Sequence, residues 1–250
     1  MVVLSRQLVL VLACVSLVAP NVCAQSTGQD AAPGAQGSTA SEPRRPIDLN
    51  AKVEEVKAKL KDNPTDYKLW WNLAWCYSTL GKHDLELDCV SKALSFAPDN
   101  TKLLGRLLGW RGGIYFDLHR LEDALNDYST GIKLNPGDPG LWSCRAETYM
   151  ELGRWNQAKD DEERVVKMQP DSVPDSWKEH GKLGNIYEVL GLYADAVKEL
   201  SRALELNPNV ADNYSLRATC YRKLGRKDLA EQDEARARSL GSSVETAQGK

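Results

Sequence analysis

Residue types that often carry enzyme chemistry occur in this sequence, but their spacing assembles no reaction centre. The three histidines, His83, His119 and His180, are far apart and lack the short spacing of metal ligands. The acidic run at 160–163 distributes its carboxylates around a helix, which favours a solvated face over a cation site. No pattern of a phosphate-binding loop, a serine hydrolase or a zinc protease is present. The sequence therefore predicts no catalytic residue, no metal site and no cofactor.

The cysteines also favour a structural role. Cys76, Cys89, Cys144 and Cys220 lie outside the N-terminal segment and are widely separated, and no CxxC pair occurs. Their even number permits two disulfides in an oxidising compartment, but this spacing favours buried free thiols.

Charge and composition limit the class of partner. The 250 residues include 32 Lys and Arg against 35 Asp and Glu, which is a formal charge of −3, and 42% of them are hydrophobic. A general nucleic-acid binder carries a strong basic excess, so we predict no nucleic-acid partner. The hydrophobic fraction is typical of a folded protein in water.

Residues 1–24 have the features of a secretory signal peptide. Arg6 precedes an apolar run over 8–19, which is shorter than the about 20 residues that span a bilayer. Ala24 ends a Val-Cys-Ala segment that fits a cleavage site. We predict an exported protein that is periplasmic or secreted, or that resides in the secretory lumen of a eukaryote. Acylation of Cys14 is the alternative, and it would anchor the chain to a lipid surface.

Residues 25–46 consist mostly of Gln, Ser, Thr, Gly, Ala and Pro. This composition cannot bury enough apolar surface to offset the entropy of ordering, so we expect a disordered linker. From residue 47 onward no stretch is long and apolar enough to span a bilayer. The body of the protein is therefore predicted not to be membrane-spanning.

Regularly spaced prolines divide the rest of the chain. The intervals between them alternate between 34 and 38 residues, and the prolines follow apolar stretches with helical spacing. Because proline stops a helix, each one marks the end of a repeating unit. The prolines are Pro64, Pro98, Pro136, Pro170 and Pro208.

The same residue types recur in order within each unit. A small residue, a Tyr three residues later and a Leu-Gly pair follow one another, as in Ala74, Tyr77, Leu80 and Gly81. The small residue lets two helices approach closely, and the glycine supplies the positive φ of the turn between them. Each unit is therefore predicted to be a helix-turn-helix. The second unit departs from this pattern, because His119 replaces the turn glycine.

The pattern resembles the tetratricopeptide repeat, in which W-x2-L-G-x2-Y, A-x3-F and P recur over about 34 residues. Trp70 and Trp142 each begin such a segment and reach a proline in register. The resemblance implies an all-α protein, an α-solenoid of helix-turn-helix repeats that forms a right-handed superhelix. Glu86 departs from the pattern by replacing a small residue, which predicts a rotated or irregular second helix in the first repeat.

A longer period of 72 residues relates pairs of repeats. Residues 112–124 match 184–196, and residues 145–164 match 217–236, so we infer that a two-repeat unit was duplicated. The four extra residues of each 38-residue unit could lengthen the first helix by about one turn of 3.6 residues. In the fourth repeat, Pro174 makes a longer loop the alternative.

These boundaries give the predicted domain organisation. The signal peptide (1–24) and the linker (25–46) precede a capping helix (47–62), which would cover the open side of the first repeat. The repeats extend over 63–241, and 242–250 is predicted to be a flexible tail. The five repeats are expected at about 63–98, 99–136, 137–170, 171–208 and 209–241.

In the family that the chain resembles, the first helices line a concave groove that binds a peptide from a partner protein. Some members hold a C-terminal carboxylate there with Lys and Asn, but Trp71 and Trp75 stand at those positions, so that clamp is absent. Packing of these two tryptophans on the capping helix is the alternative to a groove position. Carried over position by position, the groove would present Trp71, Trp75, Arg106, Phe116, Glu147, Met150, Asn185 and Arg222.

The sequence thus predicts a non-enzymatic interaction scaffold or adaptor that binds a partner protein or peptide outside the cytoplasm. The alternative is a glycan-binding or accessory subunit of an envelope enzyme complex, in which Trp71, Trp75 and Phe116 would stack on sugar rings. Coplanar tryptophans beside carboxylates would favour the sugar site. A groove that crosses all five repeats would favour the peptide.

We expect the mature protein to begin at Gln25, because cleavage after Ala24 fits the small-residue pattern of the processing site. Mass spectrometry of the N-terminal peptide of the purified protein checks this. A species that begins at an acylated Cys14 would contradict it and would place the protein on a membrane.

Overall fold

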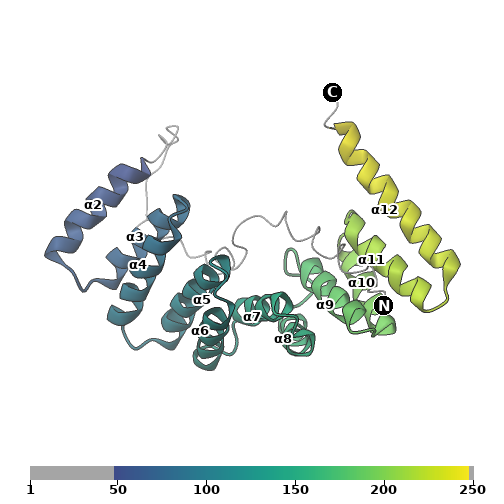
Figure 1. The fold of residues 1–250 in the computed structure, drawn as a ribbon, viewed down its shortest axis with the longest axis horizontal. Helices are drawn as coiled ribbons and strands as arrows, with labels where there is room; N and C mark the ends of the chain where they lie inside the picture. Colours follow the sequence, from purple (N-terminus) through teal and green to yellow (C-terminus); the bar gives the residue numbers. More distant parts are fainter. Residues whose placement is uncertain (1–47, 248–250) are drawn as a thin grey trace, which may run out of the picture.

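The computed structural model describes residues 48–247, with side chains over 48–241. All regular secondary structure in that range is α-helical, which confirms the predicted all-α class (Figure 1). The signal peptide and linker predicted over 1–46 lie outside the described residues. The helices are α2 (Leu49–Asp62), α3 (Tyr67–Thr79), α4 (His83–Phe96), α5 (Thr101–Asp117), α6 (Leu121–Leu134), α7 (Pro139–Glu151), α8 (Trp155–Met168), α9 (Trp177–Val189), α10 (Tyr193–Leu206), α11 (Ala211–Lys223) and α12 (Lys227–Ala247).

The helices pack as consecutive pairs, each formed by a first and a second helix joined by a tight turn. The pairs are α3 with α4, α5 with α6, α7 with α8, α9 with α10 and α11 with α12. They follow one another along an arc that has α2 at one end and α12 at the other (Figure 1). Neighbouring first helices also touch, α5 with α7 and α9 with α11, and α5, α7 and α9 lie on the inner side of the arc (Figure 1). We call the surface of the first helices on this side the inner face.

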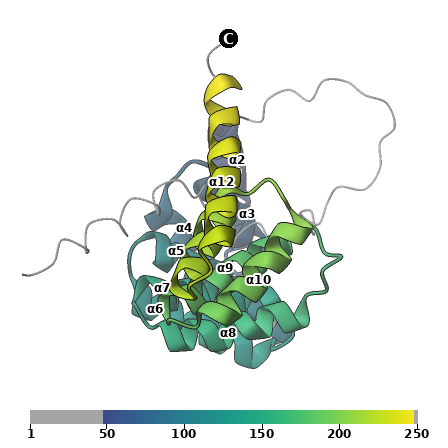
Figure 2. The ribbon, with the colours of Figure 1, turned by 90° about the vertical axis from the view of Figure 1, so that its right-hand side faces the viewer.

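The two ends of the array differ. At the N-terminal end, α2 packs on α3 and buries Val53, Val56 and Leu60, as expected of a capping helix. At the other end, α12 projects from the array (Figure 2) and continues past Gly241 to Ala247. The tail predicted over 242–250 is therefore helical over its first part.

Local sequence explains where the helices begin and turn. Asp48, Asp66, Asn100 and Asp138 each precede a helix and accept hydrogen bonds from backbone N–H groups of its first turn, at 2.8–3.1 Å. These bonds satisfy donors that have no partner within the helix. The turn glycines adopt a φ of 65–75° at Gly81, Gly153, Gly191 and Gly225, and His119 adopts 55° at the equivalent position.

The four extra residues are accommodated differently in the two long repeats. In the second repeat they extend the first helix, because α5 has 17 residues where α3 has 13. In the fourth repeat α9 keeps 13 residues, and the extra residues form a loop between α8 and α9. In that loop Asp175 has a φ of 67°, and the hydroxyl of Ser176 donates to the carbonyl of Asp171 at 3.0 Å.

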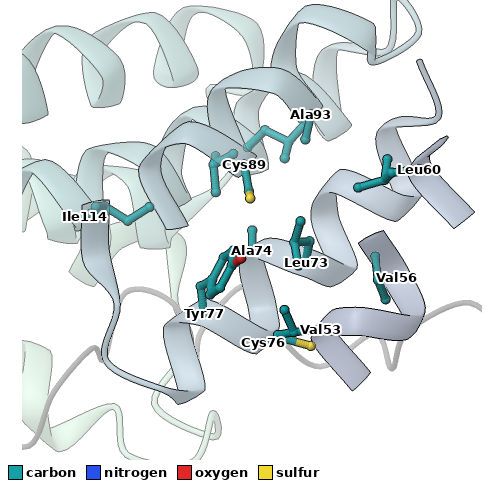
Figure 3. Close-up of a cluster of buried hydrophobic side chains, with 12 residues drawn as sticks. Val53, Val56, Leu60, Leu73, Ala74, Cys76, Tyr77, Cys89, Ala93 and Ile114 are labelled. Carbon is teal, nitrogen blue, oxygen red and sulfur yellow. The ribbon is translucent and has the colours of Figure 1, made fainter. Parts of the chain in front are cut away.

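The first hydrophobic cluster shows how the array is held together. Its side chains come from α2, α3, α4 and α5, and Figure 3 shows them meeting between these helices. Cys76 and Cys89 belong to it as free thiols, and Cys220 is a buried free thiol in the last repeat, as predicted. Burial raises the pKa of Cys89 to about 12, so this thiol stays protonated near neutral pH. Cys144 is also buried, but it is bonded in a disulfide, so the prediction of a free thiol is wrong for this residue.

Two glycines on first helices have no room for a side chain. A Cβ atom on Gly112 would lie 2.7 Å from Cε1 of Tyr128, and one on Gly184 would lie 2.6 Å from Cγ of Leu200. Tyr128 and Leu200 lie on the second helices of the same repeats. The small residues predicted from the sequence therefore set the distance between paired helices.

Buried ion pairs connect the two helices of three repeats. In each pair an Arg of the first helix makes two hydrogen bonds of 2.6–2.8 Å with an Asp 16 residues further along the chain. The carboxylates are almost fully buried, with 3–9% of each side chain exposed. We call them the Arg–Asp pairs: Arg111–Asp127, Arg145–Asp161 and Arg217–Asp233.

Two of these arginines also reach the preceding repeat. Arg145 donates to the hydroxyl of Ser129 at 3.1 Å, and Arg217 donates to Ser201 at 2.9 Å. Both serines lie on second helices, α6 and α10. One guanidinium therefore fixes three helices at once.

Glu86 overturns one expectation about the first repeat. The helix α4 is neither rotated nor irregular. It has the same length as α6 and α8, 14 residues, and the side chain of Glu86 is completely buried. The buried carboxylate is accommodated because the indole N–H of Trp110 donates to it at 2.7 Å and His83 lies 3.2 Å away.

The fourth repeat replaces the Arg–Asp pair with a histidine. Leu183 stands where the second, third and fifth repeats have Arg, and Glu199, at the position of the Asp, contacts His180 at 2.8 Å. The other ring nitrogen of His180 lies 3.1 Å from Asp171 of the long loop. The hydrogen bond with Glu199 raises the pKa of His180, burial opposes the rise, and Asp171 adds to it.

We expect Gly184→Ala to lower the free energy of unfolding by about 1–3 kcal/mol, the usual cost of overpacking a close helix contact. Urea denaturation followed by circular dichroism measures it. Gly137→Ala is the matched control, because a Cβ there meets no atom within 4 Å, and it should change stability by less than about 0.5 kcal/mol. Equal effects of the two substitutions would contradict the packing role of Gly184.

The stability that His180 contributes should depend on pH. Because the folded pKa is raised, this contribution is complete below the unfolded value of about 6.5 and is lost as the pH rises through the folded pKa. His180→Gln should therefore destabilise the protein more at about pH 6 than at about pH 9. Urea titrations of both proteins at each pH test this, and a difference that is constant or grows with pH would contradict it.

Candidate functional site

The eight residues predicted for the groove all lie on first helices. Because they are distributed over the first helices of all five repeats, α3, α5, α7, α9 and α11, they form no single cluster. Two local groups emerge instead, one between the first and second repeats and one between the third and fourth. We describe these two groups first, and then the predicted residues outside them.

The first group is an aromatic cluster of Trp71 on α3 with Arg106 and Trp110 on α5, and Trp75 follows Trp71 one helical turn later on α3. The rings of Trp71 and Trp110 meet edge to face, with centroids 5.4 Å apart and planes at 70°. The guanidinium of Arg106 lies 5.4 Å from the centroid of Trp71. Trp75 has 48% of its surface exposed. The first repeat therefore presents one exposed indole, one turn beyond a ring that already packs on α5.

The positions of the two tryptophans separate their roles. The ring contact of Trp71 is with α5, and Trp71 is partly buried against the first hydrophobic cluster. Trp70, the neighbour at the repeat's core position, donates its indole N–H to the carbonyl of Pro64 at 2.8 Å and lies 4.6 Å from Nζ of Lys92. Of the three tryptophans, Trp75 is the exposed one, with 48% of its surface open to solvent.

The second group surrounds Lys182 of α9. Its ammonium contacts Glu179 of the same helix at 2.5 Å, Glu147 of α7 at 3.2 Å and Glu162 of α8 at 3.8 Å. It also donates to the hydroxyl of Ser143 of α7. We call these five residues the Lys182 cluster. It links the first helices of the third and fourth repeats.

The charges in the Lys182 cluster are strongly coupled. Burial would lower the pKa of Lys182, but attraction by Glu162, Glu147 and Glu179 outweighs it and raises that pKa above its usual value. Burial raises the pKa of Glu162 well above its usual value, although Lys182 opposes this. Glu179 keeps a lowered pKa despite its burial, because Lys182 lies against it. The ammonium is therefore charged at neutral pH, and Glu162 holds a proton more readily than Glu179.

The two groups occupy equivalent positions. A shift of 72 residues places Ser143 on Trp71, Glu147 on Trp75 and Lys182 on Trp110. The same shift places Glu162 on Val90 and Glu179 on Leu107, both buried apolar residues of the first two repeats. The same junction of three helices is thus apolar and aromatic in one half of the array and ionic in the other.

Sequence reasoning missed Trp110, Glu179 and Lys182. The 72-residue period contained the signal for them, because it pairs each with a residue of the opposite chemical character. The period could identify these residues only after the structure showed that α3 contacts α5 and that α7 contacts α9.

The other predicted groove residues are less available to a binding partner than Trp75. Phe116 packs partly against the hydrophobic cluster of Ala124, Tyr128 and Leu141. Arg222 forms an ion pair with Glu234 of its own repeat. Met150 and Asn185 are half-buried.

No group of three His, Cys, Asp or Glu side chains over 48–241 is arranged to hold a metal ion. None of the helices α2–α12 combines the length and the apolar character needed to cross a bilayer.

Family models match three parts of the chain. The model described as "TPR repeat" matches residues 112–153, and models described as "tetratricopeptide repeat" match residues 67–100 and 177–210. These segments include α3 and α4, the end of α5 with all of α6 and α7, and α9 and α10. The fifth repeat lies outside them, and its assignment rests on the α11–α12 pair and on the 72-residue period.

Curated relatives match over shorter parts of their own length. Hsp70-Hsp90 organizing protein 2 of Arabidopsis thaliana is 28% identical over 99 residues, which is 40% of this chain and 17% of that protein. Tetratricopeptide repeat protein 13 of Homo sapiens is 30% identical over 140 residues, 55% of this chain and 16% of that protein. The chain thus spans less than a fifth of either relative.

A solved structure matches over most of its length. The structure of YrrB, described as a TPR protein with an unusual peptide-binding site, superposes with a TM-score of 0.64 at 15% identity and covers 75% of this chain and 93% of YrrB. At this identity the likeness shows the fold alone. Together with the three family-model matches, it shows that the chain contains tetratricopeptide repeats stacked as an α-solenoid.

Proposed function

We propose that this protein is a non-enzymatic scaffold or adaptor that binds a segment of a partner protein on its inner face. Proteins built from these repeats act as interaction scaffolds and adaptors, which supports the general class. The observation that carries the proposal is Trp75, a large aromatic side chain that is 48% exposed on a first helix. Exposed aromatic residues are typical anchors of protein interfaces.

The packing of the array supports an inner-face site. The buried apolar clusters lie within and between successive helix pairs, and Trp75 belongs neither to their buried residues nor to the partly buried residues packed against them. The described peptide-binding site of YrrB supports the same kind of ligand. An extended or helical peptide segment fits a surface that runs along five parallel units.

The geometry of the tryptophans does not favour the sugar-binding alternative. Stacking on a sugar requires an open ring face, but Trp110 meets the ring of Trp71 edge to face at 70°, and the guanidinium of Arg106 lies 5.4 Å from the centroid of Trp71. Phe116 is partly buried against a hydrophobic cluster. We therefore retain the peptide or protein ligand.

We further propose that the protein acts outside the cytoplasm, either in the periplasm, in a secretory lumen or as a secreted protein. This part rests on the signal-peptide features of residues 1–24 alone.

Replacing Trp75 by Ala should weaken partner binding at least about tenfold, because an aromatic anchor commonly contributes 1.4 kcal/mol or more. The test is quantitative co-purification from an extract of the source organism. Proteins retained by the wild type and depleted about tenfold by the Trp75→Ala variant are then produced and titrated by fluorescence anisotropy. The unfolding free energy should change less than for a buried tryptophan, since 48% of Trp75 is exposed.

Two variants act as controls for this experiment. Leu85→Ala removes a side chain that is 46% exposed on the second helix α4, and it should leave binding unchanged. Trp70→Ala removes a packed ring and its hydrogen bond to Pro64, and should lower stability by about 3 kcal/mol. If Trp75→Ala unfolds as readily as Trp70→Ala, or if Leu85→Ala weakens binding equally, the inner-face site is wrong.

A further inference from the structure

In the loop between α8 and α9, residues 169–176, one carboxylate joins the loop to both helices of the fourth repeat. Asp171 lies 3.1 Å from Nε2 of His180 on α9, and Nε of Arg202 on α10 donates to it at 2.9 Å. Val173, an apolar residue of the loop, is 37% exposed, so burial does little to anchor this part of the loop. The attachment to α10 therefore depends on the charges around Asp171.

The ring of His180 is bonded on both sides. Its Nδ1 lies 2.8 Å from Oε2 of Glu199, and its Nε2 lies 3.1 Å from Oδ1 of Asp171. An ionised carboxylate only accepts hydrogen bonds, so each ring nitrogen has to donate one. A neutral imidazole has a single N–H group, and only the charged ring satisfies both contacts. The bridge therefore exists as drawn only while His180 is protonated.

The neighbouring helices supply no other strong charge to this ring. On α8, Glu163 accepts a hydrogen bond from the hydroxyl of Tyr187 at 3.0 Å, and α11 places the uncharged Asn213 against α9. On α10, Lys198 lies 3.8 Å from Glu199, but its side chain is 82% exposed, so water screens this contact. The two carboxylates and the proton on His180 thus set the electrostatics of the bridge.

The other half of the array uses a permanent charge at this place. The 72-residue shift places His180 on Leu108, which is buried and cannot titrate, and Glu199 on Asp127. In that repeat the guanidinium of Arg111 binds Asp127, and an arginine keeps its proton at any pH that a folded protein meets. The second repeat is therefore held by a fixed charge and the fourth by a titratable one.

We propose that His180 is a pH-sensitive clamp that holds the loop of residues 169–176 against α9 and α10 when its ring is charged and releases the loop when the ring loses its proton. The remaining N–H stays with Glu199, which is nearer and only 13% exposed, so the contact that breaks is the one with Asp171. Because α9 begins directly after this loop, the clamp places the start of a first helix under the control of pH.

After the clamp opens, Arg202 is the remaining link between α10 and Asp171. Both side chains of this ion pair are about two-fifths exposed, 41% for Arg202 and 42% for Asp171. Exposed pairs contribute little to stability and are screened by salt. The loop should therefore become sensitive to salt only after His180 has lost its proton.

The direction of the pKa shift gives the pH range. The bond with Glu199 raises the pKa of His180 above its usual value of 6.5, burial opposes the rise, and Asp171 adds to it. The clamp is thus closed below about pH 6.5 and opens as the pH rises through the raised pKa. The bonds from Arg202 and His180 lower the pKa of Asp171, so this carboxylate stays ionised over the same range.

Hydrogen–deuterium exchange of the full chain, measured in peptides that cover 169–178 and corrected for the intrinsic rate at each pH, tests the clamp. The amides of Val173, Ser176 and Lys178 are bonded within the loop or at its junction with α9. Their corrected exchange should be about tenfold faster at about pH 9 than at about pH 6, as expected for loss of a hydrogen bond to a charged group. Raising NaCl from about 0.05 to about 0.5 M should accelerate it further at the higher pH and have little effect at the lower one.

Two variants assign the pH step to His180. His180→Gln should abolish the step, because the amide side chain does not titrate. His83→Gln is the matched control, since His83 also lies beside a buried carboxylate, 3.2 Å from Glu86, but in the first repeat, and the step should persist. A step that persists in His180→Gln, or wild-type exchange that does not change with pH, would overturn the clamp.

A measurement on the wild type keeps the test decisive if His180→Gln does not fold. The ring of His180 is titrated by NMR, with its signal assigned by elimination from His83→Gln and His119→Gln, because the chain has three histidines. The midpoint of this titration should coincide with the midpoint of the exchange step. Midpoints about one pH unit or more apart would overturn the clamp.

Discussion

Within the described residues, none of the helix pairs from α3 to α12 covers all of its own apolar surface, and the rest of the structure depends on that constraint. The first hydrophobic cluster draws side chains from four successive helices, α2 to α5, so the core of one repeat is completed by its neighbours. Stability is then distributed along the array as contacts between neighbours. The capping helix α2 follows from the same constraint, because Val53, Val56 and Leu60 cover the side of α3 that has no preceding repeat.

Within this apolar frame, the Arg–Asp pairs fix the helices in register. A buried pair contributes little net stability over an apolar one, since both charges lose water, but leaving one partner alone is costly. Arg145 shows the consequence: it bonds Asp161 of its own repeat and Ser129 of the preceding one. Only one relative placement of α6, α7 and α8 satisfies all these bonds.

Because the core and the Arg–Asp pairs hold the repeats together, the residue types on the inner face can differ between the two halves of the array. The junction that carries Trp71 and Trp110 in the first half of the array carries Ser143 and Lys182 in the second half. Both junctions join neighbouring first helices, one through ring contacts and the other through charge. A duplicated two-repeat unit thus provides two different surfaces on one backbone geometry, and a partner segment that meets both would be held in a single orientation.

The sequence by itself determined the all-α class, the helix-turn-helix pairs, the turn positions and the apolar face of the helix that precedes the first repeat. These features depend on local rules: where proline stops a helix, where a glycine or His119 takes a positive φ, and which face of Leu49–Asp62 is apolar. Sequence also placed the eight candidate residues on first helices. Only the tertiary structure decided that Trp75 is open while Phe116 is packed, that Glu86 is bonded by Trp110, and that the extra residues lengthen α5 but form a loop before α9. The physical reason is that burial and pairing depend on side chains contributed by another repeat, tens of residues away, and no local pattern records which of them meet.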